Sequence, residues 1–109
     1  MAAMAFQSLI SLEEGIVQAE WDVQRGRPDK YTDLPTERAR YVEARKKLRA
    51  KFGEHFEAHY QARRESHNSC ARANLGEHGS LYCFVLPVFY DDGGHEPWGA
   101  RDVPWGVTK

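Results

Sequence analysis

The sequence has few cysteines, no long hydrophobic run and a net charge of only −1, and each of these features excludes a class of protein. Two cysteines, Cys70 and Cys83, are too few for a disulfide framework. The longest apolar run has about ten residues, whereas a membrane-spanning helix needs about twenty. The N-terminal residues also lack the basic start of a secretory signal. The sequence therefore predicts a cytoplasmic protein with no membrane-spanning segment.

Signatures of catalysis are also lacking. Cys70 follows His67 by three residues, and the acidic pair at 91–92 lies near His95. Neither group is accompanied by an orienting third residue or an oxyanion site. No glycine-rich loop leads into the lysine and helix start that phosphate binding requires. These observations favour a non-catalytic protein that needs no cofactor.

What the sequence does contain is enough apolar surface for a core. Of its 109 residues, 41% are hydrophobic and 28% are charged, which is typical of a folded chain, so residues 1–109 are expected to form a single domain. Apolar residues at intervals of three and four predict a helix at about 9–25, capped by Ser8 or Ser11. The residues of this stripe are Leu9, Leu12, Ile16, Ala19 and Val23.

A second amphipathic helix is predicted at about 36–66. Gly53 interrupts it, so this segment is either a kinked helix or two shorter helices. Phe52 and Phe56 continue its apolar stripe and are expected to face Leu12, Ile16 or Val23. Arg45 lies along the same line. The short loop between the two helical segments predicts an antiparallel hairpin.

The segment LYCFVLPVFY predicts a β-strand at about 81–90, because aromatic and branched residues suit strands. Pro87 lacks a backbone donor, so this strand is expected at an edge or bent at the proline. An irregular tail follows at 91–109. The predicted fold class is therefore α+β, with the helical hairpin packed against a C-terminal strand or β-hairpin.

Charge is unevenly distributed along the chain. The net charge is −3 over residues 1–35, +5 over residues 36–64 and −3 over residues 65–109. The basic helix at 38–51 is able to follow a phosphate backbone, which makes nucleic-acid binding an alternative function. A solvated helix face balanced by the acidic segments explains the same pattern.

Histidine and cysteine gather in the second half of the sequence. His67, Cys70, His78 and Cys83 provide four ligands of the two types that zinc prefers. Their spacing matches no familiar zinc motif. The expectation is that no metal is bound, with these four residues as the ligands if zinc is present.

Two Pro-Trp-Gly triplets place Trp98 and Trp105 directly after prolines, which restricts the backbone beside each ring. One alternative is that the tail folds back and both indoles cover the core of the helical hairpin. The other is a binding surface, since rigid aromatic residues and arginine are typical of the most important contacts at protein interfaces. The predicted partner-binding residues are Tyr90, Trp98, Trp105, Arg45, Lys46 and Arg49. They indicate a small intracellular protein-binding regulator or inhibitor of unknown partner. Small proteins without motifs are common in phages, so a phage-like accessory role fits, and homodimerisation is left open.

Overall fold

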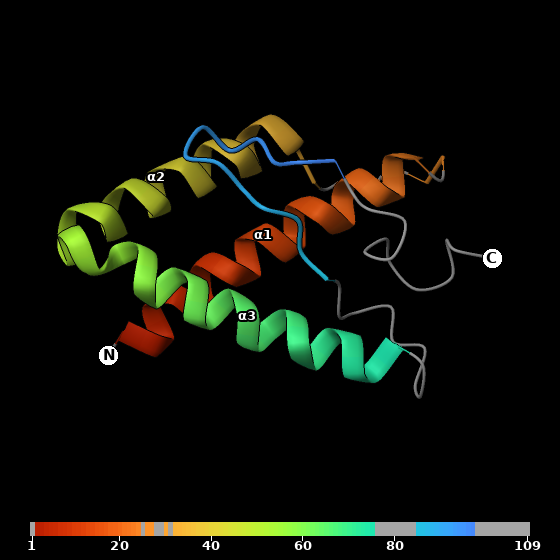
Figure 1. Ribbon diagram of the computed structural model, residues 1–109. Helices are drawn as coiled ribbons and strands as arrows, with labels where there is room; N and C mark the ends of the chain where they lie inside the picture. The colour runs from red at the N-terminus through yellow and green to blue at the C-terminus, as the bar shows by residue number, and fades with distance from the viewer. Residues whose placement is uncertain (1, 25, 28–29, 31, 76–84, 98–109) are drawn as a thin grey trace.

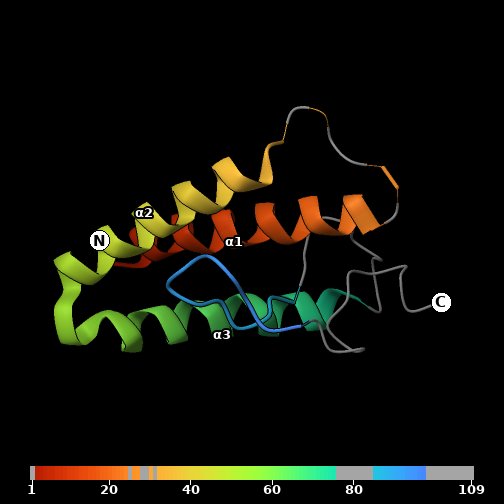
Figure 2. The same cartoon turned by 90° about the horizontal axis from the view of Figure 1, so that it is seen from above.

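The computed structural model describes residues 2–24, 26–27, 30, 32–75 and 85–97. Within these ranges the chain forms α1 (Ala2–Gln24), α2 (Leu34–Phe52), a short 3-10 turn η1 (Gly53–His55) and α3 (Phe56–Leu75). Figure 1 shows α1 running between α2 and α3. The view from above in Figure 2 places α1 beside α2, with α3 across from them.

Helix α1 begins at Ala2, earlier than the start near Leu9 that the sequence indicated. Ser8 lies inside the helix and donates a hydrogen bond to the Met4 carbonyl, so it does not cap the helix. The helix ends in a Schellman motif, in which Gly26, with φ of 73°, donates to Val23 and the next amide donates to Asp22. Glycine is suited to this position because it adopts positive φ without a steric penalty.

Gly53 separates α2 from α3. Its φ of 54° and ψ of −126° fall outside the helical region, and its amide donates to the Arg49 carbonyl. The chain then turns through η1 and reverses direction into α3, which continues to Leu75 rather than ending near Ser66. The 36–66 segment is therefore part of two helices that meet at Gly53.

The core lies where the three helices face one another. Phe56 is fully buried and Phe52 is partly buried, and both rings pack against Phe6 of α1, with centroid separations of 5.5 and 5.2 Å. Val23, one of the contacts expected for these rings, is instead 53% exposed. The remaining core residues are Leu9, Ile10, Ile16, Val17, Trp21, Tyr41, Tyr60, Leu86 and Phe89.

The prediction of an α+β fold is wrong, because the described residues form an all-α hairpin with no β-strand. Residues 85–90 of the expected strand form no regular element, and an isolated bridge joins Phe89 to His95. Residues 81–84 lie outside the described ranges. A strand needs a neighbouring strand to pair with, and here the backbone of Leu86 bonds to the side chain of Asn68 instead.

Candidate functional site

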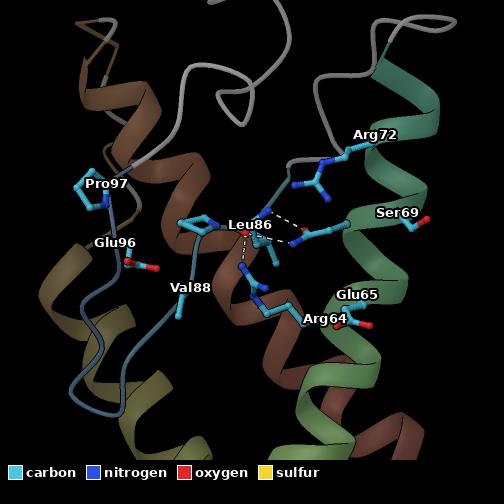
Figure 3. A pocket seen from close by; sticks show the side chains of 10 residues that line it. Arg64, Glu65, Ser69, Arg72, Leu86, Val88, Glu96 and Pro97 are labelled. Carbon is cyan, nitrogen blue, oxygen red and sulfur yellow. Dashed lines mark hydrogen bonds between the residues drawn. The ribbon is translucent and has the colours of Figure 1, made fainter.

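Residues 85–97, which we call the strap, run along α2 and cross α1 toward α3 (Figure 1). The strap is attached to α3 near its start. Asn68 accepts a hydrogen bond from the Leu86 amide at 2.8 Å and donates to the Leu86 carbonyl at 3.2 Å. Arg64 donates to the same carbonyl at 2.7 Å, as Figure 3 shows. These bonds satisfy a buried peptide group that has no strand partner.

The tip of the strap is attached to α2 by an ion pair. Asp91 accepts hydrogen bonds from Nε of Arg45 at 2.6 Å and from Nε of Arg49 at 3.0 Å. Slight burial of the Asp91 carboxyl opposes its ionisation, but these two arginines outweigh that effect and lower its pKa. Gly93 lies so close to α2 that a Cβ there would be 3.2 Å from Val42. The turn is thus fitted to this face of α2.

The end of the strap is attached to α1 and α2 through His95. Its Nε2 lies 2.6 Å from the Glu20 carboxylate, whose other oxygen accepts from Arg38 at 2.8 Å. Its Nδ1 lies 2.7 Å from the Glu96 carbonyl oxygen. The imidazole also packs on Phe89, with a centroid separation of 4.9 Å. The strap is therefore held at three points by three helices.

Beneath the strap is a buried carboxylate. Glu13 of α1 has no exposed surface and accepts hydrogen bonds from the hydroxyls of Tyr41 at 2.6 Å and Tyr60 at 2.5 Å. Burial raises the pKa of Glu13, against the effects of both hydroxyls and of Arg45. Burial and the nearby Glu13 carboxylate also raise the pKa of both tyrosines, so they remain donors. Because Glu13 is sealed from solvent, it is not placed to act on a substrate.

Arg45 connects this carboxylate cluster to the strap. The side chain is 6% exposed, and its NH1 donates to the Tyr41 hydroxyl at 2.7 Å while Nε binds Asp91. Its guanidinium lies 4.8 Å from the centroid of the Tyr60 ring and 5.6 Å from that of Phe56. Arg45 was expected at a partner-binding surface, but in this fold it is an internal cation held by aromatic rings and the strap.

The other predicted interface residues have different surroundings. Tyr90 is 46% exposed on the strap. Lys46 is exposed on α2, and it lines a hollow of about 250 Å³ together with Arg49 and Asp91. Arg49 also pairs with Glu57 at 3.1 Å and covers the Phe56 ring at 4.3 Å. The structure therefore places Lys46 and Arg49 beside the strap tip that carries Tyr90, whereas Trp98 and Trp105 lie outside the described residues.

A larger groove of about 570 Å³ lies between the strap and α3. Arg64 and Arg72 extend from α3 toward the strap, and Val88 and Pro97 form part of the opposite wall (Figure 3). Val88 is 39% exposed. Glu65 lies on the helical wall and Glu96 on the strap wall, so the groove combines apolar side chains with charges of both signs.

The zinc candidates are not brought together in the described part of the chain. His67 is mostly buried, and its Nε2 lies 3.6 Å from Glu14, whereas Cys70 is exposed. His78 and Cys83 lie outside the described residues. Within those that are described, no three potential ligands converge on a point.

Sequence reasoning missed Glu13 and the attachments made by Asn68 and His95. One signal for the carboxylate cluster was available, because Glu13 lies four residues after Leu9 and three before Ile16, inside the apolar stripe of α1. Arg45 lies in the corresponding stripe of α2. A carboxylate and an arginine on facing apolar stripes indicate a buried polar pair. Asn68 and His95 carry no comparable pattern.

Comparisons with other proteins add no assignment. No known protein family, characterised protein or solved structure is detectably similar to this chain. In the part of the chain that the structure describes, no helix has the length and apolar character required to cross a membrane.

Proposed function

We propose that this chain is a non-catalytic protein-binding regulator or inhibitor that recognises its partner through the strap. The supporting observation is the exposure of Val88 and Tyr90. Four large apolar side chains are exposed among the described residues, and these two are separated by a single residue on the strap. The residues that alternate with them, Pro87 and Phe89, are buried.

Fixed attachment makes these exposed side chains suitable for recognition. The strap is held on both sides of Tyr90, by Leu86 at its start and by Asp91 at its tip. Little conformational freedom remains to be lost on binding, which favours affinity. We call Val88, Tyr90, Lys46 and Arg49 the strap surface.

The charge around the strap surface indicates the chemistry of the partner. Lys46 and Arg49 lie on one side with Asp91, whereas the groove on the other side is lined by Arg64 and Arg72 together with Glu65 and Glu96. Positive charge is therefore in excess on the Lys46 side. We therefore expect a protein segment that presents apolar side chains together with acidic ones. An acidic partner would be attracted at long range by the cations and held at short range by the apolar contacts.

Ion pairs between the arginines of α2 and acidic side chains of the same chain argue against nucleic-acid binding by this helix. Four of its arginines have acidic partners: Arg38 with Glu20, Arg40 with Glu37, Arg45 with Asp91 and Arg49 with both Asp91 and Glu57. Phosphate binding would compete with these contacts. A protein partner that binds through Tyr90 and Lys46 would leave these ion pairs intact.

Site-specific photocrosslinking in the native cell tests the proposal. A photoreactive residue replaces Tyr90 in one variant and Ser11, an exposed residue of α1, in the control. We expect one discrete protein adduct at position 90, absent at position 11. The change Lys46→Glu should weaken that adduct about tenfold or more through charge reversal. Lys47→Glu, the adjacent exposed lysine, should leave it unchanged.

Three outcomes contradict the proposal: equal adducts at positions 90 and 11, equal effects of the two lysine changes, and adducts to nucleic acid in place of protein. Salt-sensitive binding of duplex DNA or RNA by the purified protein would favour the nucleic-acid alternative.

A further inference from the structure

His95 faces an acceptor at each of its ring nitrogens. The Glu20 carboxylate lies 2.6 Å from Nε2, and the Glu96 carbonyl oxygen lies 2.7 Å from Nδ1. A neutral imidazole carries one N–H, so it is able to make only one of these bonds. Both bonds form only when the ring is an imidazolium. We propose that His95 is a pH-sensitive latch, which closes the end of the strap onto α1 when protonated and releases it when deprotonated.

The groups around the imidazole come from three elements. Glu20 of α1 and the Glu96 carbonyl of the strap favour the charged ring, whereas Arg38 of α2 and burial of the ring oppose it. The hydrogen bond to Glu20 is the largest effect, and the pKa of His95 is raised above its ordinary value of 6.5. Arg38 also binds Glu20, so the carboxylate remains ionised and in place when the latch opens.

The direction of the switch follows from this raised pKa. The stabilisation that the charged ring provides through its two bonds is fully present below about pH 6.5 and is lost as the pH rises through the pKa of His95 in the folded protein. When the imidazolium loses a proton, one of its two ring nitrogens presents a lone pair to the oxygen that it faced, and the two repel each other. The transition therefore lies above pH 6.5, the ordinary pKa of histidine.

Release is expected to be local. The start of the strap is held by Asn68 and its tip by Asp91, and neither contact needs His95. The backbone bond from Glu96 to the Val88 carbonyl, at 2.9 Å, lies at the latched end and is expected to open with it. Opening would uncover the face of Phe89 against which the imidazole packs. The latch thus controls how much apolar surface the strap exposes, whether or not the proposed partner exists.

Nuclear magnetic resonance tests the charge directly. The ¹⁵N shifts of the His95 ring should show two protonated nitrogens at about pH 5.5 and one at about pH 9. A neutral tautomer at the lower pH overturns the proposal.

Amide hydrogen exchange tests the release. After correction for the intrinsic rate, protection of the Glu96 amide should fall about tenfold between about pH 5.5 and about pH 9, in line with loss of a charge-assisted hydrogen bond. The Leu86 amide, which donates to Asn68, should keep its protection and is the internal control. Equal pH dependence of the two amides overturns the proposal.

Two variants separate the latch from general loosening of the fold. In Glu20→Gln the carboxylate charge is removed, so the midpoint of the Glu96 change should move to lower pH. In His95→Gln the change should disappear, while the exposed control His55→Gln should behave as the parent protein. An unshifted midpoint in Glu20→Gln, or persistence of the change in His95→Gln, contradicts the latch.

Discussion

Arg45 shows how a single side chain links the core of this protein to its surface. One nitrogen reaches the Tyr41 hydroxyl in the interior, and another reaches Asp91 on the strap. Aromatic rings surround the guanidinium, so the charge is stabilised where water is excluded. An unpaired charge in such a place would cost far more than one at the surface. The position of the strap is therefore coupled to the polar cluster around Glu13.

Phe56 provides the first test at this scale. Its ring is fully buried between Phe6 and Tyr60 and supports Arg45 and Arg49. We expect Phe56→Ala to lower the free energy of unfolding by about 3–5 kcal/mol, because a cavity remains and two cation–π contacts are lost. Urea denaturation followed by circular dichroism measures this change.

Met4, which is 74% exposed, provides the matched control. Met4→Ala should alter the stability by less than about 0.5 kcal/mol. If Phe56→Ala has an equally small effect, the packing described for α3 is incorrect.

At the scale of elements, the strap depends on contacts that the helices provide. Asp91→Asn removes the ionised acceptor of the buried Arg45. The expected loss of stability is about 1–3 kcal/mol, because a charged donor in the interior is then poorly paired. Thermal denaturation and exchange of the Tyr90 amide, which donates to Gly94, report this loss.

The neighbouring Asp92 serves as the control for that change. It accepts from the Gly94 amide within the turn, and an asparagine oxygen accepts the same bond. Asp92→Asn should therefore be nearly neutral. Equal effects of the two changes would mean that the ion pair does not hold the strap.

Two glycines of the helices should respond in opposite directions to alanine. Gly53 has a backbone conformation that side chains rarely adopt, so Gly53→Ala should destabilise the protein by about 1–3 kcal/mol even though its Cβ would meet no atom within 4 Å. Gly15 lies in the middle of α1 with the same open space. Gly15→Ala should stabilise the protein by about 0.5–1 kcal/mol. Calorimetry on both variants measures whether each change raises or lowers the stability. If both changes stabilise the protein, the backbone conformation described for Gly53 is incorrect.

The elements also show what the sequence could predict. Apolar spacing identified two helical segments, and Gly53 indicated the interruption between α2 and α3. The spacing could not show that Asn68 would bind the Leu86 peptide, because this contact joins residues 18 positions apart through a side chain. Aromatic composition alone therefore predicted a strand at 81–90, whereas the described part of that segment, residues 85–90, forms none. The proximity of Lys46 to the strap tip likewise depends on tertiary contacts.

At the scale of the whole molecule, three helices and the strap share one connected set of polar groups. Glu13 belongs to α1, and the hydroxyls that donate to it belong to α2 and α3. Arg45 extends this set to the strap by donating a hydrogen bond to Asp91. A hydrophobic cluster tolerates many arrangements, whereas this set requires particular partners at particular positions. We infer that it favours one alignment of the helices at some cost in stability.

The pH dependence of global stability tests this arrangement. The pKa of Glu13 is raised from its ordinary value of 4.5 by burial, so its contribution is fully present below about pH 4.5 and is lost as the pH rises through its value in the folded protein. The pKa of His95 is also raised, so its contribution to stability is fully present below about pH 6.5 and is likewise lost as the pH rises further. Asp91 and Glu20, with lowered pKa values, contribute above their ordinary values of 3.8 and 4.5 and lose this contribution in acid.

These opposing signs predict greatest stability on the acidic side of neutrality. The free energy of unfolding, measured with urea, should be higher at about pH 5.5 than at about pH 8.5. Glu13→Gln stays neutral at every pH, so the decline toward alkaline pH should become shallower. Combining it with His95→Gln should flatten the decline further, whereas His55→Gln, at an exposed position, should leave the parent's decline unchanged. A parent protein that is more stable at the alkaline pH would contradict the burial of an ionisable carboxyl at position 13, since an ionised and well-solvated Glu13 would not weaken the fold as the pH rises.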